Sequence, residues 1–147
     1  MTLEDLRGKV GREIAVTEWL EITQERINTF ADATEDHQWI HVDQERAQRE
    51  SPYETTIAHG FLTLSLLSKF MKDAIHIDGL RMGINYGLNR VRFPAAVRVG
   101  SRIRARFVLQ SMRDVGDAAE AIYSITVEGQ RAEKPCCVAE WVVRYYA

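Results

Sequence analysis

The chain has 147 residues, 46% of them hydrophobic, which fits one compact domain with an apolar core. Its net charge of -2 gives no basic excess of the kind that binds nucleic acid or an anionic membrane. No apolar run approaches the roughly 20 residues of a membrane span, and the charged N-terminus lacks a signal-peptide core. We therefore expect a cytoplasmic protein of one domain, residues 1–147, with Cys136 and Cys137 reduced.

The first third of the chain predicts a short strand and then two helices. Residues 12–16 have strand character, and Thr23 is a candidate N-cap for a helix that ends near Thr34. Asp36 then falls in the loop behind this helix. Asp43 is a candidate cap for a short polar helix over residues 44–49, which Ser51-Pro52 would end.

Residues 60–72 predict a buried helix. Its apolar side chains cover nearly the whole circumference: Phe61, Leu62, Leu64, Leu66, Leu67, Phe70 and Met71. In a soluble chain, a helix that is apolar on all sides is normally surrounded by the rest of the protein. We expect a sheet to wrap around it.

The second half of the chain predicts that sheet. Alternating apolar residues mark strands around Ile84–Leu88, Ile103–Leu109, Ala121–Val127 and Cys137–Tyr145. The alternation changes phase near Asn89-Arg90, which indicates a β-bulge. Short gaps between the strands indicate an antiparallel meander. The fold class is therefore α+β, with helices first and a curved antiparallel sheet around one buried helix.

Two polar residues stand out in the loop behind the first long helix. Asp36 and His41 are five residues apart, and the apolar Trp39 and Ile40 between them indicate that this loop tucks into the protein. A carboxylate near a half-buried imidazole can set its tautomer or share a water molecule with it. Each residue alone is also consistent with an ordinary turn or structural role.

The His59-Gly60 step opens the apolar helix directly. A glycine there lets a substrate carbonyl approach the backbone, and the Gly60 N–H, reinforced by the helix dipole, could stabilise an enolate-like oxygen. Glycine is also acceptable at a helix start for purely structural reasons. Ser68, two turns along the helix, has a structural alternative as well, because buried helical serines often bond back to the helix backbone.

Three arginines alternate along one predicted strand, at Arg102, Arg104 and Arg106. This pattern is typical of a solvated strand face, and a contact with a CoA phosphate is the functional alternative. The sequence contains no nucleophile elbow, phosphate loop, HExxH motif or CxxC pair.

The segments FADATEDHQWIH and TTIAHGFLTLSLL resemble the MaoC-like (R)-specific enoyl-CoA hydratases, also called type-2 enoyl-CoA hydratases. Within that family the chain looks most like the branch that includes nodulation protein N. The family signature is an aspartate, any residue, Asn-Pro, an aliphatic residue and a histidine. Asp36 and His41 match its ends, Gln38-Trp39 replaces Asn-Pro, and His59-Gly60 matches the HG step. Ser68 falls where the family has a serine near the catalytic pair.

The resemblance implies a hotdog fold and a homodimer with an acyl-CoA tunnel at its interface. It implies reversible hydration of trans-2-enoyl-CoA to (R)-3-hydroxyacyl-CoA, without a metal or other cofactor. Asp36 and His41 would be catalytic, Gly60 the oxyanion hole, and Ser68 and His59 supporting residues. The residues leave open which of Asp36 and His41 is the base.

Two other functions are considered. The first is an acyl-CoA thioesterase. Such enzymes often have a catalytic carboxylate on the central helix, and residues 60–72 contain none, which counts against this function. A non-catalytic acyl-CoA-binding protein of the nodulation type is the second, because Gln38-Trp39 departs from the signature.

Overall fold

The computed structural model describes all residues from 1 to 147. Five antiparallel pairings join six strands into one sheet, in the order β1-β4-β5-β6-β3, with β2 paired to β4. The strands are β1 (Glu13–Val16), β2 (Leu20–Glu21), β3 (Met82–Arg92), β4 (Arg102–Val115), β5 (Ala118–Gly129) and β6 (Cys137–Tyr146). The helices are α1 (Leu3–Arg7), α2 (Gln24–Thr34), α3 (Trp39–Val42), α4 (Gln44–Glu50), α5 (Gly60–Ser65) and α6 (Leu67–Ala74).

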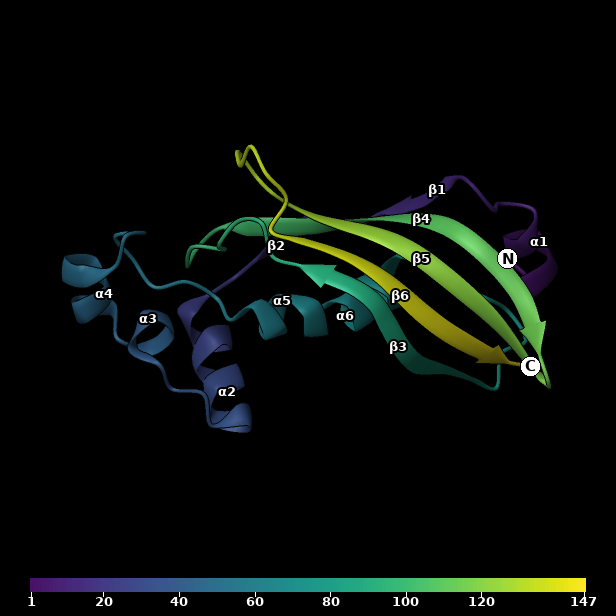
Figure 1. Cartoon of the computed structure of the whole chain (residues 1–147), viewed down its shortest axis with the longest axis horizontal. Helices are drawn as coiled ribbons and strands as arrows, with labels where there is room; N and C mark the ends of the chain where they lie inside the picture. The colour runs from purple at the N-terminus through teal and green to yellow at the C-terminus, as the bar shows by residue number, and fades with distance from the viewer.

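The sheet curves over α5 and α6, while α2, α3 and α4 form a group beyond one end of it (Figure 1). Both termini lie toward the opposite end of the sheet. The predicted α+β class is confirmed. No helix has the length and apolar character needed to cross a membrane.

The predicted caps lie where the sequence placed them. The Thr23 side chain accepts a hydrogen bond from the Arg26 N–H at 3.2 Å and begins α2. The Asp43 carboxylate accepts one from the Arg46 N–H at 3.0 Å and begins α4. Because α2 ends at Thr34, Asp36 lies just past its end, as predicted.

Strands β4, β5 and β6 follow the predicted alternation. One side chain in two points at the helices and is fully or almost fully buried: Ile103, Ala105, Phe107 and Leu109 on β4, Ala121, Tyr123, Ile125 and Val127 on β5, and Cys137, Ala139, Trp141, Val143 and Tyr145 on β6. The β3–β6 register shifts between Leu88 and Arg90, which confirms the predicted bulge, and it shifts again between Asn85 and Gly87.

The predicted meander is wrong at its first connection. Strand β3 pairs with β6 and lies at the far edge of the sheet, so it makes no hairpin with β4. The segment between β3 and β4 bonds instead to the residues before α5. The Ala58 N–H donates to the Val97 carbonyl at 2.8 Å, and the Val99 N–H to the Thr56 carbonyl at 3.0 Å. The segment held by these bonds connects β3, at one edge of the sheet, with β4, which β5 and β6 separate from it.

The central helix is also less enclosed than predicted. It is divided at Leu66 into α5 and α6, although Leu66 keeps helical backbone angles. Leu62, Leu67 and Phe70 are buried against the sheet, whereas the Phe61 side chain is 71% exposed. One sheet covers only one side of a helix, so the opposite apolar side is left open in a single chain.

Candidate active site

His41 lies on α3, a single helical turn, and its side chain points into the protein. The residue is buried, and its Nδ1 donates a hydrogen bond to the Ile57 carbonyl at 2.7 Å. A carbonyl oxygen can only accept, so Nδ1 carries the proton and Nε2 keeps a free lone pair. Burial lowers the pKa of His41 below its usual 6.5, and the neighbouring His59 lowers it further. The Ile57 hydrogen bond and Asp36 act in the opposite direction. His41 is therefore neutral near pH 7 and able to accept a proton.

Asp36 and His59 complete a cluster around His41. The His59 ring stacks on the His41 ring, with centroids 3.8 Å apart and planes at 23°. His59 Nε2 donates to the Asp36 carbonyl at 3.0 Å and lies 3.9 Å from a carboxylate oxygen of Asp36. The Asp36 side chain is half exposed, whereas His59 is buried and its Nδ1 has no partner. The structure thus brings three sequence-predicted residues together, with Asp36 on the solvent side.

These three residues are also the only group of three or more histidine, cysteine, aspartate or glutamate side chains close enough to share a metal ion. Their ligand atoms lie up to 4.8 Å apart. Ligands around a tetrahedral zinc ion lie roughly 3.3 Å from one another, so the group would have to contract. His59 Nε2 already donates a hydrogen bond to the Asp36 carbonyl, so this nitrogen is not free to bind a metal. This arrangement fits a small polar group shared between Asp36 and His41 better than it fits a metal centre.

Gly60 is the first residue of α5. Its N–H donates to no other group in the chain, as expected for the first turn of a helix. A Cβ at this position would lie 3.1–3.2 Å from the Phe93 ring, so a larger residue would require that ring to move by a few tenths of an ångström. Gly60 and His41 both line a cavity of about 270 Å³ whose other walls include Tyr53, Phe93 and Cys136. A free backbone donor therefore faces the same space as the imidazole.

Gln24 and Phe30 on α2 contact this cluster, and neither role could be predicted from the sequence. The Gln24 amide donates to the His41 carbonyl at 2.8 Å and accepts from the buried Thr56 hydroxyl at 2.5 Å. The Phe30 ring packs 4.9 Å from the His59 ring. These residues looked like ordinary amphipathic helix positions, because their partners are distant in sequence.

Ser68 is not part of this cluster. It is exposed on α6 and hydrogen-bonds to neither Asp36 nor His41. It lines a cavity of about 160 Å³ together with Phe61, Leu64 and Leu88, between the helices and β3. Its predicted supporting role has no contact within one chain and stays a prediction.

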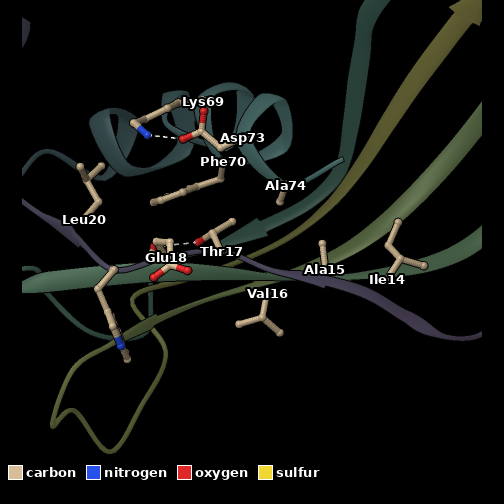
Figure 2. Close-up of a pocket in the computed structure, with 11 residues that line it drawn as sticks. Ile14, Ala15, Val16, Thr17, Glu18, Leu20, Lys69, Phe70, Asp73 and Ala74 are labelled. Carbon is tan, nitrogen blue, oxygen red and sulfur yellow. Dashed lines mark hydrogen bonds and ion pairs between the residues drawn. The ribbon is translucent and has the colours of Figure 1, made fainter. Parts of the chain in front are cut away.

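Two other features of the structure offer few groups for catalysis or binding. Arg104 and Arg106 both contact Glu128, and Arg106 also contacts Glu13, so these two arginines of the predicted row are neutralised. A second cavity of about 270 Å³ lies between residues 14–20 and α6 (Figure 2). Three charged residues line it. Lys69 and Asp73 face each other in an ion pair, and Glu18 is the third.

The buried thiols are also inert. Cys136 and Cys137 are both free. Burial raises the pKa of Cys136 to about 12 and that of Cys137 to about 11. Although Cys136 reaches the His41 cavity, it is a protonated thiol there and a poor nucleophile.

Comparison with known proteins identifies the family. A family model described as "MaoC like domain" matches residues 5–130. The chain belongs to the MaoC-like dehydratase family. It is 50% identical to 3-hydroxyacyl-thioester dehydratase Z of Mycobacterium tuberculosis, over 99% of this chain and 97% of the relative. It is 45% identical to nodulation protein N of Rhizobium leguminosarum bv. viciae, over 97% and 89%. The predicted family and branch are confirmed.

Solved structures of MaoC-like proteins share the fold. The MaoC-like dehydratase from Rhodospirillum rubrum superposes with a TM-score of 0.79 at 21% identity, over 99% of this chain and 97% of that one. The (R)-hydratase from A. caviae involved in PHA biosynthesis gives 0.71 at 23% identity, over 91% and 94%. The predicted hotdog fold is confirmed.

Proposed function

We propose that this chain is a hydro-lyase that reversibly dehydrates a 3-hydroxyacyl thioester, with (R)-3-hydroxyacyl-CoA and trans-2-enoyl-CoA as the substrate pair. The reaction class is that of the 50%-identical MaoC-like relative, which the chain matches over nearly its whole length. One observation carries the assignment of residues. A neutral imidazole with a free Nε2, a carboxylate and an unbonded helix-start N–H lie around one small region.

In the hydration direction, one water molecule lies between His41 Nε2 and the Asp36 carboxylate. A member of the pair removes its proton as the oxygen attacks C3 of the enoyl group. The pair then delivers a proton to C2, so it ends in its starting protonation state. The bare Nε2 favours His41 as the group that accepts the water proton. Because the two groups interact, their apparent pKa values belong to the pair.

Charge develops on the thioester oxygen when C3 is attacked. The Gly60 N–H is the donor for this oxygen, which would approach it through the cavity that Gly60 shares with His41 and Phe93. The reaction needs no metal and no redox cofactor, since only a proton and a hydroxyl group are transferred.

His59 acts as a positioning residue in this proposal. It stacks on the His41 ring and holds the Asp36 backbone, so it fixes the spacing between the two catalytic side chains. Ser68 lies along the open helix face with Leu64, where it would border the acyl chain.

We also propose a homodimer. Strand β3 is an edge strand whose exposed side is apolar, with Ile84, Tyr86 and Leu88 each 39–58% exposed. The exposed Phe61 lies on the neighbouring open side of the helix. A second copy of the same chain would cover both the bare strand edge and the apolar patch. It would also enclose the acyl groove.

Hydration of crotonyl-CoA, followed by loss of its conjugated absorbance, tests the function. We expect turnover by the wild type and losses of roughly 10²–10⁴-fold in Asp36→Asn and in His41→Gln. Asp43→Asn is a matched control outside the cluster, to be read together with its folding stability because Asp43 caps α4. Wild-type rates in both catalytic variants would refute the assignment of the pair.

Two outcomes would point to the other functions considered. Release of free CoA thiol from saturated acyl-CoAs would indicate a thioesterase. Tight binding of enoyl-CoAs of several chain lengths without turnover would indicate a non-catalytic acyl-CoA-binding protein.

A further inference from the structure

Arg98 lies next to residues that line the cavity containing His41. Its backbone forms a bridge with Ile57, the residue whose carbonyl binds His41 Nδ1. Its Nε donates to the Tyr53 carbonyl at 3.2 Å, and its guanidinium carbon lies 6.0 Å from the centre of the Tyr53 ring. Tyr53 and Val97 both line the cavity. The positive charge therefore lies beside Tyr53, a residue of the cavity wall, although Arg98 itself does not line the cavity.

This charge is not neutralised within the chain. No carboxylate lies within 4.0 Å of Arg98, in contrast to Arg104 and Arg106, which share Glu128. The side chain is exposed, and Nε makes its only hydrogen bond. The two terminal nitrogens are free, and together they present the planar fork that matches a phosphate group.

The cavity itself is mostly uncharged. Between the His41 imidazole and the rim, its walls are largely apolar: Ile57, Ala58, Phe93, Pro94, Ala95, Ala96 and Val97. Such walls suit a neutral, extended group and offer no charged partner inside. An anionic group attached to the far end of that extended group would emerge beside Arg98.

We propose that Arg98 binds a phosphate of the carrier to which the acyl thioester is attached. This inference rests on the proposed function. Both CoA and acyl carrier protein present the acyl group on a neutral pantetheine arm that ends in a phosphate ester, and CoA adds phosphates on its nucleotide. Arg98 is thus a specificity-determining residue that recognises the carrier, while His41, Asp36 and Gly60 act on the acyl group.

The test compares three crotonyl thioesters, those of CoA, phosphopantetheine and pantetheine, in the wild type and in Arg98→Gln. We expect the substitution to raise KM by about 10-fold or more for a thioester that carries the recognised phosphate, with kcat little changed. For the pantetheine thioester, which has no phosphate, KM should be the same in both proteins. An effect with CoA and phosphopantetheine places Arg98 on the phosphate at the end of the arm. An effect with CoA alone places it on a nucleotide phosphate.

A matched control is Arg81→Gln. Arg81 is also exposed and without a carboxylate partner, but it lies beside the C-terminal end of β6, where its N–H donates to the Tyr146 carbonyl. This variant should leave KM unchanged for all three thioesters. Added salt should raise the wild-type KM for crotonyl-CoA more than that of Arg98→Gln, because salt screens an exposed charge pair.

Two results would overturn the proposal. One is an unchanged KM in Arg98→Gln for all three thioesters. The other is an equal loss for all three, which would show that Arg98 only supports Tyr53 and the cavity wall. Failure of the proposed function looks different, since the wild type would then hydrate none of the three.

Discussion

His41 is held in one tautomer and one protonation state by its surroundings. The Ile57 carbonyl keeps the proton on Nδ1, and burial disfavours the charged ring. The stacked His59 ring adds to this effect. The result is an imidazole that can accept a proton at neutral pH, next to a carboxylate that remains open to solvent.

The first prediction at this scale concerns pH. His41 has a lowered pKa, so it stays neutral until the pH falls clearly below 6.5, and only then loses its ability to accept a proton. The acidic limb of kcat/KM should therefore lie below pH 6.5. The same shift means that the unfolded chain binds this proton more readily, so stability should decrease as pH falls below 6.5. A pH profile of crotonyl-CoA hydration checks the first point, and an acidic limb above pH 6.5 would contradict it.

The second prediction concerns Gly60. In Gly60→Ala the new methyl group would occupy the space under the Phe93 ring, where we place the thioester oxygen. We expect kcat to fall by about 10-fold or more, within the range of losing an oxyanion donor, with only a small change in melting temperature. The double variant with Phe93→Ala gives the methyl group room. Recovery of the rate in that variant would mean that displacement of the ring, and not obstruction of the oxygen, caused the loss.

At the scale of elements, three segments meet at Gln24. Its side chain ties α2 to α3 through the His41 carbonyl and to the segment before α5 through Thr56. Each partner is a polar group that would otherwise be poorly satisfied. The position of α3, and with it of His41, therefore depends on a side chain from the preceding helix.

We expect Gln24→Ala to destabilise the protein by about 1–3 kcal/mol, because it leaves the buried Thr56 hydroxyl without an acceptor. The rate of hydration should fall as well, because α3 loses the hydrogen bond from Gln24 to the His41 carbonyl. Chemical denaturation and crotonyl-CoA kinetics measure the two effects. Gln44→Ala, on the exposed first turn of α4, is the control and should change neither. Equal stability of the two variants would contradict the bridging role.

At the scale of the whole molecule, the exposed apolar surface is concentrated on β3 and the open helix face. This distribution is the physical basis for the proposed dimer, because an apolar edge strand left bare would associate with other chains in any case. Closing it with an identical copy satisfies both surfaces at once.

The dimer can be tested with a charge on β3. Ile84→Lys places an ammonium group in the middle of the proposed interface and should shift the protein from dimer to monomer in sedimentation velocity. Val10→Lys is a matched control, because Val10 is 44% exposed and Ile84 is 43% exposed, but Val10 lies outside the patch. A monomeric wild type at micromolar concentration would contradict the proposal.

Features that depend only on neighbouring residues could be predicted from the sequence. The caps at Thr23 and Asp43, the alternation of β4, β5 and β6, and the bulge in β3 are all local, and all are present. The same local patterns placed Asp36 just past the end of α2. The family motif added His41, His59 and Gly60 as residues to examine.

How these elements pack against one another could be seen only in the folded chain. It placed β3 beside β6, left one side of the central helix open and stacked His59 on His41. It also set the Gln24 bridge and brought Arg98 beside Tyr53 at the cavity wall. Each of these depends on contacts between residues far apart in the chain. Hydrophobic periodicity states which side of an element is buried, but not which partner covers it.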